Sequence, residues 1–256
     1  MDLRFSDRVD AYVAGRPGYP AALVAVVREA LQLDDNAVVA DIGAGTGLLS
    51  RTFLDAGHPV YGVEPDAAMA AAAARMLGGQ PRWTACRGSA ENTGLDANSA
   101  DLYTAGQAFH WFDAARAREE ALRILRGQAA VALVWNERPR LAEDSALTPF
   151  LADYESLVLE FDIGTYRRVA DSWSERSPLD AFFGGAQRRR LAVPHVHRVT
   201  REGLVARASS CSYLPGVGQD RHAEMVDALD GLFARYADGE RVDMVYRTVA
   251  IVGWLG

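Results

Sequence analysis

Lysine is absent from this chain of 256 residues, and all 27 of its basic residues are arginine. This absence excludes a Schiff base on lysine, and with it pyridoxal-phosphate and lysine-aldolase chemistry. It also excludes a Walker phosphate-binding loop, in which a lysine precedes the final serine or threonine. Cysteine is nearly absent too, because Cys86 and Cys211 are too few for a disulfide framework or a metal cluster.

Long apolar runs are also missing, since no stretch approaches the 18 residues that a membrane-spanning helix needs. Residues 1–10 are charged, so we expect no secretion signal and predict a cytoplasmic protein. Acidic residues outnumber basic ones by 34 to 27, which gives a net charge of −7. This charge, together with the lack of a basic arm, disfavours a nucleic-acid partner. We expect no membrane partner either.

The sequence does contain an alternation of short apolar runs and helical patterns. Strands are predicted at 37–42, 59–64, 82–87, 100–105 and 129–135. Helices are predicted at 20–31, 48–56, from Asp66 to Gly78 and over about 113–125, where Gly127 is expected to end the last one. Such an alternation is typical of an α/β protein with a doubly wound, Rossmann-like sheet. Ligands of these folds bind at the carboxyl ends of the strands.

The alternation stops after Trp135. Residues 136–143 are polar, and 144–161 carry large apolar side chains at helical spacing, which either line a substrate pocket or belong to the core. Further strands are predicted at 188–200 and 242–252, and further helices at 202–209 and 221–236. We therefore expect about seven strands in a single domain, with a helical cap or insertion after the fifth strand.

The most informative segment is Asp41-Ile-Gly43-Ala-Gly45-Thr-Gly47, between a predicted strand and a predicted helix. Its glycines allow a close backbone approach to a ligand, although a plain tight turn explains them as well. The Gly-x-Gly-x-x-Gly pattern of dinucleotide sites fails here, because Leu48 stands at the sixth position. Asp41 would repel a pyrophosphate and attract an ammonium or sulfonium group. Both observations disfavour a nicotinamide dehydrogenase.

A second acid, Glu64, ends the next predicted strand 64 − 41 = 23 residues after Asp41. This is close to the spacing of about 20 residues at which an acid binds ribose hydroxyls. Its carboxylate can accept hydrogen bonds from both hydroxyls of a ribose. The alternative is an ordinary solvated strand end. Met69, in the following helix, could lie against a purine.

Several segments of the chain, taken together, resemble the motifs of a known protein family. The relevant segments are Val39 to Gly47, Val63-Glu64-Pro65-Asp66, Tyr12-Val-Ala-Gly-Arg16-Pro17-Gly-Tyr19-Pro20, Gly88-Ser89-Ala90-Glu91 and Gln107-Ala-Phe109-His110-Trp111-Phe112. They resemble the motifs of class I S-adenosylmethionine-dependent methyltransferases, and in particular a small-molecule subset that includes trans-aconitate methyltransferase-like enzymes. The resemblance covers about residues 9–137 and is looser beyond.

The resemblance implies S-adenosyl-L-methionine as cofactor. The residues it assigns to cofactor binding are Tyr12, Arg16, Asp41, Gly43, Ala44, Gly45, Thr46, Gly47, Glu64, Pro65, Asp66, Met69, Ser89, Ala90, Glu91, Gln107 and Ala108. Arg16 would pair with the cofactor carboxylate from an amino-terminal lid, unless it is a surface residue. Ser89 departs from the pattern, because related proteins often have an aspartate there.

The acceptor is expected beside the segment 109–112, where Phe109, His110 and Trp111 would contact it. His110 is the first candidate for a general base, with Tyr19 and Tyr213 after it, although His110 could also be a packing residue. Trp111 could face the sulfonium or belong to the core. We expect no metal, because His195 and His197 lack a third ligand nearby. Arg188 to Arg190 is expected to be a solvated strand end.

The function implied is methyl transfer to a small molecule by one domain, 1–256. Its expected parts are a lid and helix (1–34), a cofactor-binding core (35–137), a cap (138–186) and a segment that completes the sheet (187–256). Two alternatives stay open: other chemistry on the cofactor, such as its cyclisation, and cofactor binding without catalysis. A monomer or a homodimer is compatible with the sequence, which leaves the acceptor atom undecided.

Overall fold

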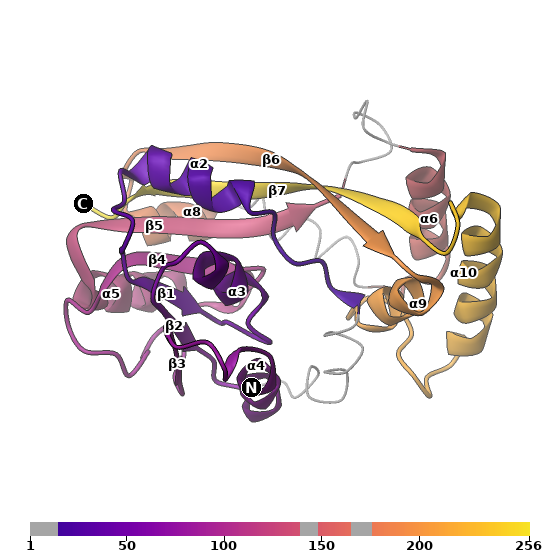
Figure 1. The fold of residues 1–256 in the computed structure, drawn as a ribbon, viewed down its shortest axis with the longest axis horizontal. Coiled ribbons are helices and arrows are strands. Elements are labelled where there is room, and N and C mark those ends of the chain that lie inside the picture. The colour runs from indigo at the N-terminus through magenta and orange to yellow at the C-terminus, as the bar shows by residue number, and fades with distance from the viewer. Residues whose placement is uncertain (1–14, 139–147, 165–175) are drawn as a thin grey trace. The chain divides into compact units, whose positions relative to one another are not determined.

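A computed structural model describes residues 15–138, 148–164 and 176–256 (Figure 1). The chain forms two compact units, each built from three separate segments. The sheet unit consists of Gly18–Asn136, Glu175–Val193 and Thr248–Gly256. The helical unit consists of Met1–Pro17, Glu137–Ser174 and Pro194–Arg247. The divisions between the units fall inside three strands, β5 (Leu125–Glu137), β6 (Arg188–Val199) and β7 (Val242–Trp254), so each of these strands contributes to both units.

The sheet has seven strands in the order β3-β2-β1-β4-β5-β7-β6. The strands are β1 (Val39–Ile42), β2 (Val60–Val63), β3 (Trp83–Cys86), β4 (Ala100–Gly106), β5 (Leu125–Glu137), β6 (Arg188–Val199) and β7 (Val242–Trp254). The first five in this order pair in parallel, whereas Figure 1 shows β7 running opposite to β5 and β6. The prediction of a Rossmann-like α/β fold with about seven strands is therefore confirmed.

Five helices of the described chain belong to the sheet unit: α2 (Ala22–Leu31), α3 (Leu48–Asp55), α4 (Ala67–Leu77), α5 (Ala114–Ile124) and α8 (Arg176–Phe183). Asp66 begins α4 as predicted, because its carboxylate accepts hydrogen bonds from the backbone N–H groups of Ala68 and Met69 at 2.8 and 2.9 Å. Apolar side chains of α2 and α3 pack with the buried strands in one cluster, in which Leu23, Val27 and Phe53 are fully buried.

One local prediction was wrong, that of where the fourth predicted helix ends. Gly127 does not end the fourth predicted helix, because α5 ends at Ile124 and the backbone of Leu125 is already extended. Gly127 instead lies inside β5, where it and Ala129 adopt positive φ angles of 59° and 54° near an irregularity in the pairing with β4. The predicted cap at 138–186 contains α8, which belongs by its contacts to the sheet unit and packs against α5.

The helical unit contains α6 (Pro149–Glu160), α9 (Arg201–Ser209) and α10 (His222–Tyr236) together with the adjoining ends of β6 and β7. Thr148 begins α6 by accepting a hydrogen bond from the N–H of Leu151. The apolar face of α6 is core, because Tyr154 and Val158 pack in one cluster with Met225 of α10. Of the two interpretations of this helix, the structure thus supports the packing role.

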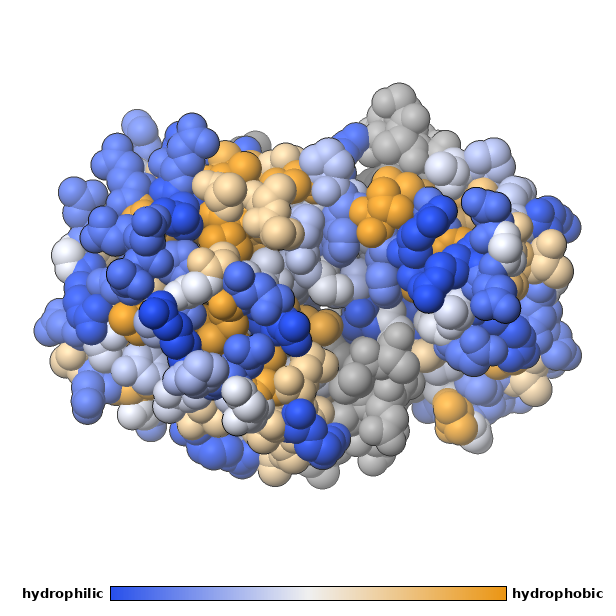
Figure 2. All heavy atoms as spheres, viewed as in Figure 1, coloured by the Kyte–Doolittle hydropathy of each residue, from blue (hydrophilic) through white to orange (hydrophobic). Residues whose placement is uncertain are grey.

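Hydrophilic residues cover most of the face drawn in Figure 2, with apolar residues in small groups among them. Within the described residues, no helix combines the length and the apolar character needed to cross a bilayer.

Candidate functional site

The predicted site residues of the sheet unit gather at the carboxyl ends of β1, β2 and β4. The strand order reverses between β1 and β4, which is where ligands bind in open α/β sheets. In the loop after β1, Gly43, Gly45 and Gly47 have φ angles of 67°, 58° and 86°. Glycine adopts this left-handed region without the steric cost that other residues pay.

The three glycines differ in what surrounds them. A Cβ on Gly43 would lie 2.7 Å from the Cβ of Ala108, and one on Gly47 would lie 2.5 Å from Cδ1 of Leu77. A Cβ on Gly45 would have no heavy atom within 4 Å among the described residues. Gly43 and Gly47 are therefore required by internal packing, whereas the backbone at Gly45 borders open space that a ligand can occupy.

Glu64 connects the end of β2 to the glycine loop. Its Oε2 accepts a hydrogen bond from the backbone N–H of Gly45 at 2.8 Å, and its Oε1 accepts one from the N–H of Asp66 at 2.8 Å. Only 8% of the residue is exposed, so it is not a solvated strand end. Burial raises the pKa of Glu64, and the two backbone hydrogen bonds oppose that shift. Each carboxylate oxygen still has a lone pair for a ligand hydroxyl.

Asp41 lies on β1 and is fully buried. Its Oδ2 accepts a 2.6 Å hydrogen bond from the Ser50 hydroxyl, while Oδ1 has no hydrogen-bond partner among the described residues. Burial raises the pKa of Asp41 to about 7, although the hydrogen bond from Ser50 lowers it. Sequence reasoning missed Ser50, whose one detectable sign is a polar residue at an inward position of α3. The buried Thr46 hydroxyl also has no partner in the described chain.

The end of β4 carries Gln107 and Ala108. Gln107 has a positive φ of 57°, and its side-chain amide donates to the carbonyl of Asn136 at 3.4 Å. Asn136 is buried and was not predicted: its amide donates to the carbonyl of Gly18 at 3.0 Å, and its Oδ1 accepts from the Thr248 hydroxyl at 2.6 Å. Its one sign in the sequence is a polar residue directly after the apolar run of β5.

Tyr19 also reaches the end of β4, because a Cβ on Gly106 would lie 2.6 Å from its hydroxyl oxygen. A short 3-10 helix, Phe109–Trp111, follows. Phe109 is buried, and its ring packs edge-on against Phe182 at a centroid distance of 5.2 Å. Trp111 is 58% exposed and so is not a core residue. The half-buried ring of His110 lies 4.8 Å from it, centroid to centroid.

The remaining predicted cofactor residues lie beside β2 and β3. Met69 and Ala90 are buried, at 5% and 3% exposure. The backbone N–H of Ser89 donates to the carbonyl of Asn92. The carboxylate of Glu91 accepts a 2.9 Å hydrogen bond from the N–H of Asp113, the residue that begins α5. Pro65 is half-buried beside Glu64.

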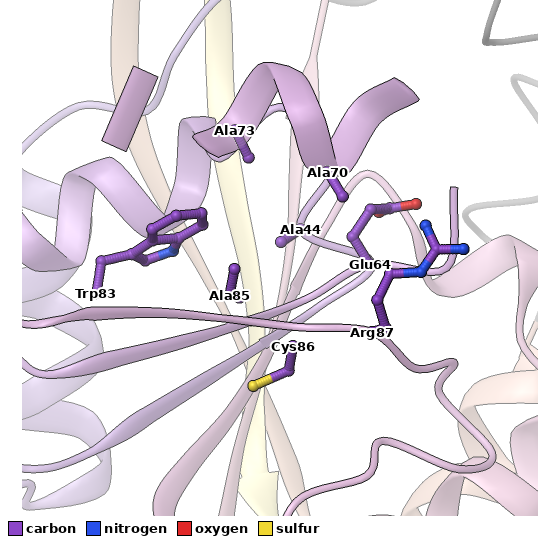
Figure 3. A pocket seen from close by; sticks show the side chains of 9 residues that line it. Ala44, Glu64, Ala70, Ala73, Trp83, Ala85, Cys86 and Arg87 are labelled. Carbon is purple, nitrogen blue, oxygen red and sulfur yellow. The ribbon is translucent and has the colours of Figure 1, made fainter. Parts of the chain in front are cut away.

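A cavity of about 60 Å³ lies beside Glu64 (Figure 3). Of the predicted cofactor residues, Ala44 and Glu64 line it, and Figure 3 shows the Arg87 guanidinium directed toward the Glu64 carboxylate. The indole N–H of Trp83, in the cavity wall, is buried and has no partner in the described chain. The volume of this cavity is smaller than that of an engineered cavity of about 150 Å³ that holds benzene.

Two predicted residues, Arg16 and Tyr213, belong to the helical unit. Tyr12 is outside the described residues. Arg16 belongs to the helical unit, where its guanidinium donates to the hydroxyl and carbonyl oxygens of Ser210 at 3.2 and 3.1 Å. Tyr213 also belongs to the helical unit, and burial raises the pKa of its phenol, which keeps it protonated.

His195 and His197, both on β6, are the residues that the sequence offers as candidate metal ligands. Burial, followed by the charge of His197, lowers the pKa of His195 to about 4, which keeps His195 neutral. Across the described parts of the chain, no group of three or more His, Cys, Asp or Glu side chains is arranged to hold a metal ion. Arg188 pairs with Asp180, and Arg189 and Arg190 are exposed, as expected for a solvated strand end.

The sequence of this chain is similar to sequences of known methyltransferases. Residues 40–133 match the family model described as a methyltransferase domain. An uncharacterized methyltransferase of Mycobacterium tuberculosis is 38% identical over 138 residues, which is 54% of this chain and 54% of the relative. This match thus spans about half of the mycobacterial relative. An uncharacterized methyltransferase-like protein of Schizosaccharomyces pombe is 27% identical and covers 98% of this chain, with 95% of its own length aligned.

Solved structures share the fold. A protein from Anaeromyxobacter dehalogenans, assigned as a type II methyltransferase, aligns with a TM-score of 0.61 at 22% identity, covering 94% of this chain and 98% of its own. A [4+2]-cyclase aligns with a TM-score of 0.52 at 16% identity, covering 98% of this chain and 93% of its own. This chain therefore shares a Rossmann-like fold with these proteins, and its residues 40–133 match a methyltransferase domain.

Proposed function

We propose that this protein transfers a methyl group from S-adenosylmethionine to a small-molecule acceptor. The observation that carries the proposal is the position of Glu64, which holds the glycine loop through the N–H of Gly45 and keeps lone pairs for a ribose. This arrangement lies at the reversal of the strand order and inside the segment matched by the methyltransferase family model. The narrower likeness to trans-aconitate methyltransferases stays a prediction.

The residues present fit such a cofactor. The open side of Gly45 accommodates a ligand against the backbone, and the unpartnered Oδ1 of Asp41 provides an acceptor for an ammonium group. Both Asp41 and Glu64 favour a cationic ligand over a pyrophosphate. When bound, the cofactor supplies a methyl group on a sulfonium, which is already an activated electrophile. The protein's task is therefore alignment of the acceptor and exclusion of water.

The acceptor would meet the methyl group beside the 3-10 helix after β4. Phe109 is fixed there by its packing on Phe182, and the exposed Trp111 offers an aromatic face for a substrate. His110 is the residue we expect to accept a proton when the acceptor must lose one. Tyr213 is a weaker candidate, because its raised pKa disfavours the phenolate form.

The proposal is tested by isothermal titration with S-adenosylhomocysteine, the product form of the cofactor. We expect saturable binding at one site per chain. An absence of heat at millimolar concentration with folded protein would overturn the proposal. A small-molecule acceptor, a cytoplasmic location and a monomeric or homodimeric state remain predictions that this titration does not address.

Two alternatives share the fold and the cofactor, and a cyclase with this fold shows that the fold alone does not decide the chemistry. Mass spectrometry after incubation of the protein with S-adenosylmethionine separates them. Methylthioadenosine released without an acceptor indicates cyclisation of the cofactor. S-adenosylhomocysteine formed only when metabolite fractions are added indicates methyl transfer. Binding with neither product indicates a protein that holds the cofactor without catalysis.

A further inference from the structure

Asn136, near the end of β5, holds two distant parts of the chain with one buried side chain. Only 5% of the residue is exposed. Its Nδ2 donates to the carbonyl of Gly18 at 3.0 Å, and its Oδ1 accepts from the Thr248 hydroxyl at 2.6 Å. Gly18 and Thr248 lie 118 and 112 residues away from it in sequence. Burial of an amide is costly unless its polar groups are bonded, and here both ends of the amide are.

These three residues lie at the border of the sheet unit. Gly18 and Asn136 are the first and last residues of one of its segments, and Thr248 is the first residue of another. The Asn136 amide therefore joins the two ends of one segment and attaches both to β7. The Thr248 hydroxyl is fully buried, and it sets which way the amide faces because it donates to the oxygen. The nitrogen is thereby directed at Gly18.

The hydrogen bond at Gly18 acts on Tyr19. A peptide group is planar, so the carbonyl of Gly18 and the N–H of Tyr19 form one rigid unit, and fixing the carbonyl fixes the start of Tyr19. The Tyr19 hydroxyl lies over Gly106, where an added Cβ would be 2.6 Å from it. Gly106 is the last residue of β4. The Asn136 side chain therefore controls the position of a hydroxyl at the carboxyl end of β4, where the predicted site residues gather.

The backbone of Asn136 acts on Gln107, the residue that follows β4. The side-chain amide of Gln107 donates to the carbonyl of Asn136 at 3.4 Å, and its backbone N–H donates to the carbonyl of Val134 at 2.9 Å. Gln107 has a φ of 57°, a conformation that costs a non-glycine residue free energy and persists only where the surroundings hold it. Asn136 thus bonds both to Gln107 and to the residue before Tyr19.

We propose that Asn136 is a positioning residue of the methyl-transfer site. Its amide and its carbonyl hold Tyr19 and Gln107 in place, and the Thr248 hydroxyl orients the amide. That Tyr19 and Gln107 belong to such a site rests on the proposed function. The residue type matters, because an asparagine presents a donor to Gly18, whereas an aspartate would turn a carboxylate oxygen toward the carbonyl oxygen.

The test measures the binding of S-adenosylhomocysteine to the full chain by calorimetry, together with the melting temperature of each variant. N136D is nearly isosteric and replaces the donor at Gly18 by an oxygen. We expect it to weaken binding by about tenfold or more, as for a buried polar group that loses its partner. T248V removes the hydroxyl that orients the amide and should weaken binding a few-fold. T248S keeps the hydroxyl and should bind within about twofold of the wild type.

The control is T104V. Thr104 is fully buried on β4, and its hydroxyl donates to the carbonyl of Ala132 on β5 at 2.8 Å. T104V therefore removes a buried hydrogen bond between the same two strands, before their carboxyl ends. It should lower the melting temperature and leave the affinity for S-adenosylhomocysteine unchanged, which separates a loss of stability from a loss of positioning.

A second measurement needs no ligand. Hydrogen exchange, followed by mass spectrometry, reports the local opening of each segment. In N136D, and to a smaller extent in T248V, the peptides that cover residues 18–24 and 103–108 should exchange several-fold faster than in the wild type. Exchange in α5 should be unchanged, because this helix has no hydrogen bond to Asn136 among the described residues.

The proposal is overturned if N136D lowers the melting temperature as T104V does and binds S-adenosylhomocysteine as the wild type does. It is also overturned if T248S weakens binding as much as T248V, and this pair provides the test if N136D does not fold. If the wild type itself does not bind S-adenosylhomocysteine, the proposed function fails and hydrogen exchange tests the inference separately. Faster exchange at 18–24 and 103–108 then retains the positioning role of Asn136, and unchanged exchange removes it.

Discussion

The Ser50 hydroxyl donates a 2.6 Å hydrogen bond to Oδ2 of Asp41, and both residues are fully buried. This bond stabilises the carboxylate form but does not offset the cost of burying its charge, so the pKa of Asp41 rises to about 7. The second oxygen, Oδ1, has no partner in the described chain. An acid that is half-protonated near neutral pH, in the loop region of a candidate cofactor site, has measurable consequences.

The first consequence concerns stability. The folded-state pKa of about 7 lies above the ordinary value of 3.8, so the folded protein holds a proton that the unfolded chain releases. The contribution of Asp41 is fully present below pH 4 and is lost as the pH rises through 7. It amounts to a change on the order of 4 kcal/mol at most. Urea unfolding at several pH values should show this loss in the wild type and not in D41N. An equal pH dependence in D41N would contradict it.

The second consequence concerns the cofactor. A ligand with an ammonium group near Asp41 favours the ionised carboxylate, so binding below pH 7 should release a proton. The affinity for S-adenosylhomocysteine should therefore rise as the pH increases through about 7. Titration calorimetry in buffers of different ionisation enthalpy counts the released protons. D41N should release none from this position, and its affinity should lose this pH dependence.

Glu64 should be sensitive to an isosteric change, because both of its oxygens accept backbone hydrogen bonds. In E64Q the amide nitrogen cannot accept, so one N–H, of Gly45 or Asp66, loses its partner at a cost of about 1–3 kcal/mol. We expect a lower melting temperature and at least tenfold weaker binding of S-adenosylhomocysteine. E119Q, an exposed carboxylate of the same unit, serves as the control and should change neither quantity. Unchanged affinity in E64Q would remove Glu64 from the cofactor site.

Substitutions of Gly45 and Gly47, two glycines of the same loop, should have different effects on stability and on ligand binding. Both G45A and G47A place a side chain at positive φ, which costs roughly 1–2 kcal/mol. G47A adds a clash at 2.5 Å with the buried Leu77, so it should be the less stable variant by a further 1–3 kcal/mol or so. G45A meets no atom of the described chain, yet its methyl group occupies the space predicted for the cofactor. We expect G45A to fold and to lose S-adenosylhomocysteine binding; if it binds normally, the loop does not contact the cofactor.

Much of the sheet unit could be predicted from the sequence because its signals are local. A buried parallel strand is a short, mostly apolar run, and Asp41 lies near the end of one such run while Glu64 directly follows the next. The start of β5 was not predictable from the sequence. A glycine after a helical pattern, as at Gly127, is a typical helix stop, and only the pairing of β5 with β4 makes this segment a strand. Ser50 and Asn136 were missed for a related reason: their importance comes from partners that only the fold brings near.

The division into units was beyond sequence reasoning for another physical reason. Each unit is assembled from three segments that are far apart in the chain. The apolar pattern of α8 does not distinguish a helix that packs on α5 from one that covers a substrate.

The pH dependence of stability expected from Glu120 has the opposite sign to that expected from Asp41. It accepts hydrogen bonds from the N–H and the hydroxyl of Thr93 at 2.8 and 2.5 Å, and it pairs with Arg123 at 2.7 Å. Burial raises the pKa of Glu120, but the bonds from Arg123 and Thr93 outweigh burial and lower it overall. Its contribution to stability is therefore present above pH 4.5 and is lost as the pH falls through the depressed folded-state pKa.

E120Q should lower the free energy of unfolding at pH 7 by about 1–3 kcal/mol, because an amide has no charge to pair with Arg123 and its nitrogen cannot accept the bond that Oε2 accepts from Nε of Arg123. The difference from the wild type should shrink as the pH falls through the depressed folded-state pKa of Glu120, because the wild-type carboxyl then becomes protonated. Urea unfolding of E120Q and D41N across one pH series measures both effects together. The wild type should lose stability at low pH through Glu120 and at neutral pH through Asp41, and each variant should remove one of the two slopes. A series in which E120Q shows the same difference from the wild type from pH 7 down to the lowest pH at which the protein is folded would show that the network acts by packing and not by charge.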